Sequence, residues 1–249
     1  MISDLIIGTA QMSILQNLPY SLCEPGPEQV DGIGNFHLQV LAPAPSKLLL
    51  SNLYFLDSHG QIPSKIHNPD YQSIMQSQIE WFTKTSQAQR SAREKSGNIN
   101  RFHLSLAFLH IPLPEFGDRH LNIRNGHRRE PTEGPHLNSH FYDTLVEEGI
   151  SAVACGHDHV NDFCALLPEA QAGPWLCYGG GSGFGGYCSY NKKRFHRRMR
   201  VWEIDTSIWS LITWKRVEYA SNRVDELVLV ENGTVVDPPG YDEDSSVAG

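Results

Sequence analysis

The chain has 249 residues, of which 40% are hydrophobic, which is enough to bury the core of one domain or a large part of one. Its formal charge of −8 argues against a nucleic-acid binder, and it lacks the apolar run of about 18 residues that a membrane span needs. Its five cysteines, an odd number without repeated spacing, predict reduced thiols and an intracellular, cytoplasmic protein.

The first half of the sequence contains strand-like segments and one long amphipathic pattern. Residues 36–41 and 48–56 are apolar and predict two strands. Asn68-Pro69 indicates a helix start, because proline is favoured at the first helical position. An apolar stripe at helical spacing follows, which consists of Tyr71, Ile74, Met75, Ile79 and Phe82.

The later segments add more strands and a short helix. Strands are predicted at 102–109, 150–155, 198–205 and 208–217. A helix is expected from Ser139, as the N-cap, to Glu148, with Gly149 as its stop. Mixed strands and helices predict an α/β (α+β) layered domain.

Histidines stand where two of these strands end. The strand at 102–109 leads directly into His110, and the strand at 150–155 leads into His157 and His159. Ligand sites in open α/β sheets gather at the carboxyl ends of strands, and neutral imidazole binds zinc, iron or manganese. The alternative is that some of the 12 histidines stand at strand ends by chance.

Polar residues around the second pair of histidines could support them. Asp158 stands between the two histidines, and Asn161 follows them closely. Carboxylate and amide groups next to metal-binding histidines commonly orient the imidazole rings. We therefore expect Asp158 and Asn161 to position the rings rather than to bind a metal.

The sequence Gly156–Cys164, GHDHVNDFC, is similar to the GHDHVNDYC motif of the purple-acid-phosphatase-like branch of calcineurin-type phosphoesterases, known in fungi and plants. Other segments match the same family pattern in the same order, namely LPYS (18–21), VDGIGN (30–35), YFLDS (54–58), QIEWF (78–82), HIPLPE (110–115) and YGGG (178–181). The resemblance covers residues 11–217.

The resemblance implies a β-sandwich flanked by helices that holds two metal ions, of iron, zinc or manganese, joined by a bridging carboxylate. It implies hydrolysis of phosphate esters by a metal-bound hydroxide. Carried over to this sequence, His110 and His157 would bind one metal and His159 the other. His120, in a loop that aligns less well, would face the substrate.

The family's earlier motifs are absent from this sequence. These motifs, Asp-x-His, Gly-Asp-x-x-Asp and Gly-Asn-His, supply most of the ligands, including the bridging aspartate. Asp57-Ser58-His59 fits Asp-x-His literally, but its surroundings match a later part of the family pattern. We therefore expect Asp57 and His59 to have a structural or supporting role.

The expected domain organisation follows from these matches. Residues 11–217 are predicted to be the C-terminal portion of the phosphoesterase domain, without its N-terminal strands. Residues 218–236 would form a C-terminal extension, and residues 237–249, rich in proline and acidic side chains, a disordered tail. Such a chain is expected to be a truncated record of a longer enzyme or to pair with a partner chain.

Two segments have more than one interpretation. Gly179–Gly186 is rich in glycine but lacks the lysine of a phosphate-binding loop, so a hairpin beside the active site is favoured. Lys192–Arg200 carries six basic residues, which favours a half-exposed strand over a nucleic-acid patch because its last part alternates.

Two functions stay open at this point. The first is a metal-dependent phosphatase that acts on an unknown phosphoester, with no nucleic-acid or membrane partner. The second is a non-catalytic fragment or pseudoenzyme that binds a metal or a protein partner. The 249-residue chain alone is predicted to have little or no phosphatase activity.

Overall fold

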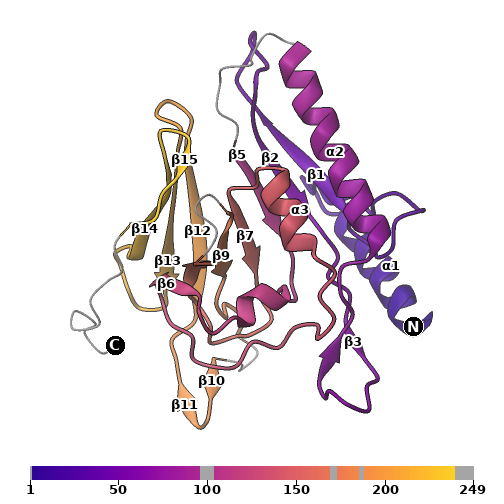
Figure 1. Cartoon of the computed structure of the whole chain (residues 1–249), viewed down its shortest axis with the longest axis vertical. Helices are drawn as coiled ribbons and strands as arrows, with labels where there is room; N and C mark the ends of the chain where they lie inside the picture. Colours follow the sequence, from indigo (N-terminus) through magenta and orange to yellow (C-terminus); the bar gives the residue numbers. More distant parts are fainter. Residues whose placement is uncertain (1, 96–103, 169–172, 185–187, 239–249) are drawn as a thin grey trace.

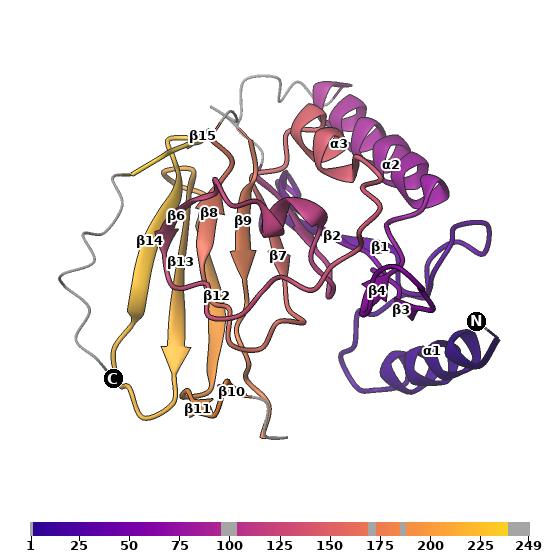
Figure 2. The same ribbon diagram turned by 60° about the horizontal axis from the view of Figure 1, so that its bottom comes forward.

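The computed structural model describes residues 2–95, 104–168, 173–184 and 188–238. Two sheets pack face to face, and helices cover the other side of the larger sheet (Figures 1 and 2). The predicted α/β layered fold, a partial β-sandwich flanked by helices, is confirmed.

The larger sheet has the strand order β1-β2-β5-β7-β9-β8-β6. Its strands are β1 (Phe36–Leu41), β2 (Leu49–Phe55), β5 (Leu104–Phe108), β6 (Asn122–Asn125), β7 (Ala152–Cys155), β8 (Cys164–Leu166) and β9 (Trp175–Tyr178). The strands β2, β5, β7 and β9 run parallel, and β1, β8 and β6 join them in antiparallel pairs. The carboxyl ends of four neighbouring strands therefore meet at one edge.

Strand alternation divides the core into two layers. In β5, Leu104 and Leu106 point into the core between the sheets, whereas Ala107 and Leu109 point to the helical side. Successive strand residues face opposite sides, so a strand with both faces covered reads as a continuous apolar run. The segment 102–109 is mostly apolar because its described side chains pack into two cores, one on each face of the sheet. Residues 102 and 103 of this segment lie outside the described residues.

The smaller sheet is antiparallel, with the order β12 (Arg198–Asp205), β13 (Ser210–Val217), β14 (Val224–Glu231) and β15 (Thr234–Val235). The first two strands agree with the predicted segments at 198–205 and 208–217. Residues 218–236, expected as an extension, contain β14 and β15, which continue the same sheet through pairing with β13. Most of the predicted tail, residues 239–249, lies outside the described residues.

The helices are α1 (Ile2–Gln16), α2 (Gln76–Lys95), the 3₁₀ turn η1 (Pro114–Gly117) and α3 (Phe141–Glu147). The predicted helix start at Asn68-Pro69 is wrong. Residues Asp70–Tyr71 form β4, which pairs with β3 (Gln61–Ile62) and keeps this backbone extended. The helix begins at Gln76 because the side chain of Gln78 accepts a hydrogen bond from the backbone N–H of Met75 at 2.8 Å, half of a capping box.

Helix α3 ends as expected but begins differently. Its N-cap is His140, with a φ of 59° and no side-chain cap, and not Ser139 as predicted. Oδ1 of Asn138 accepts the backbone N–H of His140 at 2.8 Å, which turns the chain just before the helix. Gly149, with a φ of 71°, provides the predicted stop.

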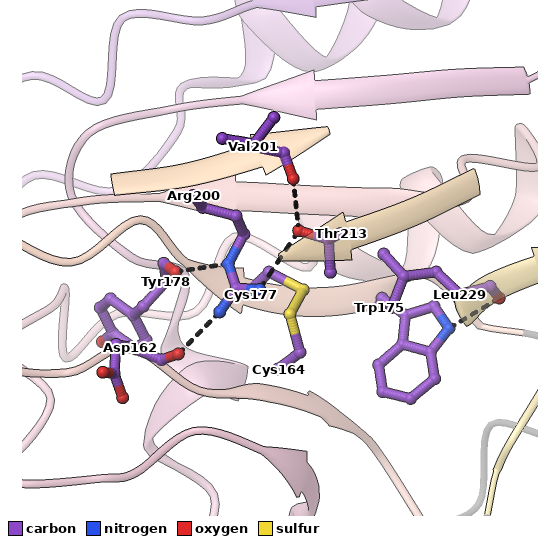
Figure 3. The surroundings of a disulfide bond; sticks show 9 residues. All are labelled: Asp162, Cys164, Trp175, Cys177, Tyr178, Arg200, Val201, Thr213 and Leu229. Carbon is purple, nitrogen blue, oxygen red and sulfur yellow. Dashed lines mark hydrogen bonds between the residues drawn. A yellow bond between two sulfur atoms is a disulfide. The ribbon is translucent and has the colours of Figure 1, made fainter. Parts of the chain in front are cut away.

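The expectation that all five cysteines are reduced is wrong. Cys164 on β8 and Cys177 on β9 form a disulfide in the core between the sheets (Figure 3). The two residues lie directly opposite each other in the strand register, with Cα atoms 4.2 Å apart. Strand pairing brings them together, and sequence spacing does not reveal it. Cys23, Cys155 and Cys188 are free.

The cellular location stays a prediction. None of the helices in the described part of the chain combines the length and the hydropathy that crossing a bilayer requires.

Candidate functional site

His110 follows β5 and is held by the neighbouring strand. Oγ of Ser58, just beyond β2, accepts the backbone N–H groups of His110 at 3.1 Å and of Ile111 at 2.8 Å. Ser58 is buried, so one hydroxyl satisfies two amides at the turn that carries the histidine. The side chain of His110 itself is exposed at the carboxyl edge of the sheet.

His157 follows β7 and approaches His110 closely. The rings are perpendicular, with centroids 5.4 Å apart. Gly156 permits this approach, because a Cβ added there would lie 3.2 Å from Nδ1 of His110. Its backbone N–H also donates to the carbonyl oxygen of His110 at 3.0 Å. The two strand ends therefore bring two imidazoles together, as predicted.

The surroundings of His157 leave one nitrogen without a partner. Nε2 of His157 is buried and makes no hydrogen bond within the described part of the chain. The ring of Tyr71 packs against the imidazole edge to face at 4.8 Å, and the Tyr71 hydroxyl donates to Oε2 of Glu133 at 3.2 Å. Burial raises the pKa of Tyr71 to about 12, with a smaller contribution from Glu133. A buried, unpartnered imidazole nitrogen has the chemistry of a metal ligand.

The surroundings of both imidazoles lower their pKa and so favour the neutral form. His110 has an exposed face, but the partial burial of its ring lowers its pKa, and a positive charge on His159 would lower the pKa further. Burial also lowers the pKa of His157, followed by the charge of His110, while Glu133 opposes the shift. His159 thus lies close enough to act on both. Neutral imidazole is the form that coordinates a metal ion.

The donor set is incomplete for the metal centre that the resemblance implies. Among the described residues, no group of three or more histidine, cysteine or acidic side chains is arranged to hold a metal ion. The pair His110 and His157 fits part of such a centre, because it offers two neutral nitrogens. The assignment of His159 to a second metal stays a prediction.

Asp158 turns away from the solvent into the helical-side core. Its carboxylate accepts a short hydrogen bond from the Tyr178 hydroxyl of β9 and the backbone N–H of Glu133 at 3.2 Å. Burial raises the pKa of Asp158 to about 7. These contacts anchor the segment that carries His157 and His159 to β9 and to the backbone at Glu133.

Asn161 holds the loop that covers the site. Its Oδ1 accepts the backbone N–H groups of Arg129 at 2.8 Å and Glu130 at 3.1 Å, and its Nδ2 donates to the Glu130 carbonyl at 3.1 Å. Glu130 in turn accepts the backbone N–H of Val160 at 2.8 Å. The side chain of Asn161, which is fully buried, therefore joins its own loop to the backbone of the loop that contains Arg129 and Glu130.

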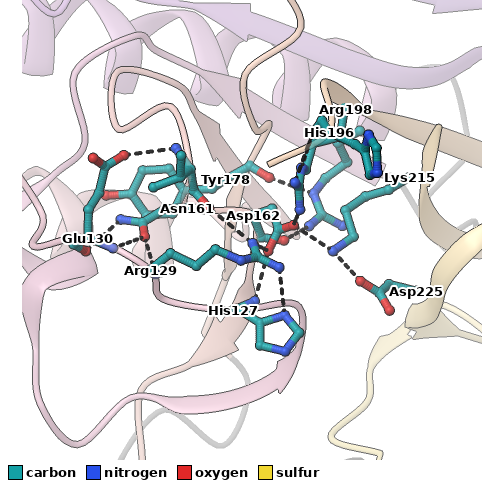
Figure 4. Close-up of polar contacts among 12 residues, drawn as sticks. His127, Arg129, Glu130, Asn161, Asp162, Tyr178, His196, Arg198, Lys215 and Asp225 are labelled. Atoms are coloured by element: carbon teal, nitrogen blue, oxygen red, sulfur yellow. Dashed lines mark hydrogen bonds and ion pairs between the residues drawn. The ribbon is translucent and has the colours of Figure 1, made fainter. Parts of the chain in front are cut away.

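Asp162 is the centre of a buried ionic cluster (Figure 4). Its carboxylate lies 2.7 Å from Nη1 of Arg129, 2.5 Å from Nη1 of Arg198 and 3.1 Å from Nζ of Lys215. The side chain is fully buried, which alone would raise its pKa, but the three cations hold the pKa well below its ordinary value. Asp225 also pairs with Lys215, so the cluster carries two carboxylates.

The basic residues at the start of β12 belong to this cluster. Arg198 is buried and Met199 is 52% exposed, so the strand alternates, as predicted. The inward side carries the arginines: Arg200 donates to the carbonyl oxygens of Tyr178 at 2.8 Å and Asp162 at 2.6 Å (Figure 3). Burial lowers the pKa of Arg200 to about 10.

Comparison with known proteins places the chain among phosphatase-like proteins. No protein-family model matches it. It is 38% identical over 226 residues to "Probable inactive purple acid phosphatase 29" of Arabidopsis thaliana, which is 83% of this chain and 56% of that protein. It is 33% identical over 248 residues to "Probable inactive purple acid phosphatase 14" of the same plant, 91% of this chain and 60% of that protein.

A yeast protein gives a similar match. "Phosphatase DCR2" of Saccharomyces cerevisiae is 36% identical over 212 residues, 80% of this chain and 35% of that protein. The homologues of the chain described here are purple-acid-phosphatase-like proteins. The resemblance to the calcineurin-type phosphoesterases is thereby confirmed, and the chain spans about half the length of the plant relatives it matches.

In this purple-acid-phosphatase-like chain, the Asp57-Ser58-His59 segment has structural contacts. Oδ2 of Asp57 accepts the backbone N–H of Ile33 at 2.8 Å, and Oδ1 accepts that of His59 at 2.9 Å. Nε2 of His59 lies 2.7 Å from Oε1 of Gln78. The supporting role expected for Asp57 and His59 agrees with these contacts.

His120 lies elsewhere in the fold. It is exposed, and it stands just before the amino end of β6, where its backbone N–H donates to Asp118 at 2.7 Å. His127, which follows the carboxyl end of β6, is the histidine that meets the site loop, because its N–H donates to Oδ1 of Asp162 at 2.8 Å. The substrate-facing role of His120 stays a prediction.

Four residues around the site are not predictable as site residues from the sequence, namely Ser58, Tyr71, Glu133 and His127. A serine after a strand carries no specific signal. Tyr71 fits the predicted helix stripe, but it lies on β4, and this position turns it toward His157. Glu133 and His127 lie in the loop 126–136, whose fold depends on partners distant in sequence.

Proposed function

We propose that this chain supplies histidine ligands to a metal-dependent phosphoesterase that hydrolyses phosphate esters. The observation that supports it best is the buried Nε2 of His157, which has no hydrogen-bond partner in the described ranges, beside the imidazole of His110. Both lie at the carboxyl edge of parallel strands, where α/β folds place their ligand sites. The names of the relatives support the same reaction class.

The chain's own residues would position the ligands. Ser58 and Gly156 fix the two turns that carry His110 and His157, so little ordering remains when a cation arrives. A bound metal would supply an activated water and neutralise charge on the phosphate. His110, being exposed, leaves this edge open to a phosphorylated substrate.

The remaining ligands would come from a part of the protein beyond these residues. Two dications near neutral imidazoles repel each other unless a carboxylate bridges them. The described residues offer no such three-donor group. We therefore expect the 249-residue chain to bind one divalent ion weakly and to turn over little substrate.

A second function is favoured by the same incomplete set. A non-catalytic module would need no bridging carboxylate, and two relatives carry "probable inactive" in their names. Such a module would use the histidine pair to bind a metal ion or a protein partner.

Activity and metal binding distinguish the two functions. The assay would follow hydrolysis of an aryl phosphate with manganese or zinc for the 249-residue chain and for a longer protein with Asp-x-His and Gly-Asp-x-x-Asp motifs ahead of this sequence. Under the first proposal the longer protein is active, His157→Ala abolishes the activity, and the exposed control His140→Ala does not. An inactive, well-folded longer protein that still binds zinc through His157 would favour the non-catalytic module.

A further inference from the structure

A cavity lies next to the loop that carries His159. It has a volume of about 370 Å³, and its lining includes Arg194, Phe195, His196, Arg197, Glu218 and Tyr219. This size is at the small end of the roughly 300–1,000 Å³ typical of small-molecule sites. The proposed function uses none of the six lining residues named above.

The cavity adjoins His159 through the backbone of Gly181. A Cβ added at Gly181 would lie 2.8 Å from the carbonyl oxygen of His159 and 3.2 Å from Sγ of Cys188, which lines the cavity. The Gly181 carbonyl accepts the backbone N–H of Arg198 at 2.8 Å. One glycine backbone thus separates the loop of the histidine pair from the cavity.

Positive charge in the cavity is available to a ligand. Arg197 is paired with Glu218, so these two charges offset each other. The exposed guanidinium of Arg194 has no hydrogen-bond or ion-pair partner within the described parts of the chain. An arginine fork matches phosphate oxygens in geometry and charge, and Arg194 belongs to the basic segment Lys192–Arg200.

Aromatic surface accompanies this charge. Tyr219 is 87% exposed, and the ring of His196 meets it edge to face at 5.6 Å. Phe195 lies among cations, with Arg129 at 5.1 Å and Lys193 at 5.4 Å from its centroid. Flat exposed rings next to arginine are the elements on which nucleobases stack.

We propose that this cavity binds a nucleoside monophosphate unit, with the phosphate on Arg194 and the base on Tyr219. Its place next to His159 makes the unit the non-reacting part of a phosphoester substrate, a role that rests on the proposed function. Binding itself does not, because neither Arg194 nor Tyr219 belongs to the histidine pair.

The test is calorimetric titration of the 249-residue chain with adenosine 5′-monophosphate in a chelating buffer, so that metal at the histidines plays no part. Arg194→Ala and Tyr219→Ala should each weaken binding about tenfold, the usual loss for an arginine–phosphate contact or a stacked base. The controls are Arg119→Ala, at another exposed arginine, and Tyr20→Ala. Tyr20 is a close match for Tyr219, since it is fully exposed and has a φ of 65° against 67°.

Each outcome decides the proposal. Loss in the two cavity variants with both controls within about twofold supports it, because ordinary surface substitutions have small effects. Absence of binding, equal binding of inorganic phosphate and the nucleotide, or equal losses in the controls would overturn it. Phosphatase activity is measured separately, with metal and the longer protein, so failure of one proposal leaves the other intact.

Discussion

Nη1 of Arg198 lies 2.5 Å from Oδ2 of Asp162, and this contact joins the smaller sheet to the loop that carries the candidate site. Arg129 reaches the same carboxylate from the loop 126–136, and Lys215 reaches it from β13. Ion pairs with the loop 126–136 and with the smaller sheet therefore hold the site loop in place.

Asp162→Asn is expected to destabilise the fold by about 3–5 kcal/mol, because it leaves three cations facing a buried group without its charge. Asp143→Asn, at a side chain that is 66% exposed, should cost less than about 0.5 kcal/mol. Urea unfolding followed by tryptophan fluorescence measures both. A loss in Asp162→Asn as small as in the control would mean that the cluster contributes little to stability.

The cluster also makes stability depend on pH in one direction. The pKa of Asp162 is depressed in the folded chain, whereas an aspartate in the unfolded chain has a pKa of about 3.9. The unfolded state then binds more protons, so the contribution of Asp162 is complete above about pH 5 and is lost as the pH falls toward the folded pKa. The difference in unfolding free energy between wild type and Asp162→Asn should be constant from pH 7 to 5 and shrink below pH 4. A difference that widens in acid would contradict this sign.

Gly126→Ala should destabilise the chain more than Gly149→Ala. Both glycines have positive φ angles, of 76° and 71°, so both variants carry the same backbone strain of about 1–2 kcal/mol. A Cβ at Gly126 would lie 2.3 Å from the Asp162 carbonyl oxygen, whereas nothing lies within 4 Å of one at Gly149. We expect an additional loss of about 1–3 kcal/mol in Gly126→Ala from this overlap. Equal thermal midpoints for the two variants would argue against the close packing of these loops.

Thiol counting tests the disulfide. The unfolded, unreduced protein should expose three reactive thiols, those of Cys23, Cys155 and Cys188, and all five cysteines should react after reduction. The Cys164→Ala/Cys177→Ala variant should lose about 2–3 kcal/mol of stability, since a loop of this length is constrained in the unfolded chain. Cys23→Ser serves as the control. Five reactive thiols before reduction would mean that the disulfide does not form and that all five cysteines are free.

Sequence patterns predicted those parts of the fold that depend on local periodicity. The strand at 198–205 and the helix stop at Gly149 were both predicted, because alternation and a left-handed glycine are local signals. The start of α2 was not, because pairing of Tyr71 with Gln61 overrides the favourable proline position. The disulfide was missed for the same reason, as strand register decides which cysteines meet.

The histidines of the site could be predicted from the sequence, but their contacts could not. His110 and His157 were placed correctly because each follows a buried strand in a sheet whose parallel strands end together. The partners of those histidines were not, since Ser58 and Tyr71 approach them through tertiary contacts. The alternation of Arg198 and Met199 is a local signal, but the burial of the strand's charged side depends on Asp162, which lies in the loop before β8 of the other sheet.

The Asp162 cluster also sets an order of events during synthesis. The carboxylate and Arg198 are separated by 36 residues, and Lys215 lies further along the chain. When the ribosome has synthesised the histidines but not yet β12 and β13, Asp162 has no ion-pair partner from the second sheet. The loop can settle only when those strands have emerged and docked, since contacts distant in sequence form late. A ribosome-bound intermediate would therefore have β5 and β7 paired, with His110 and His157 as neighbours, while Asp162 still lacks the cations of the second sheet.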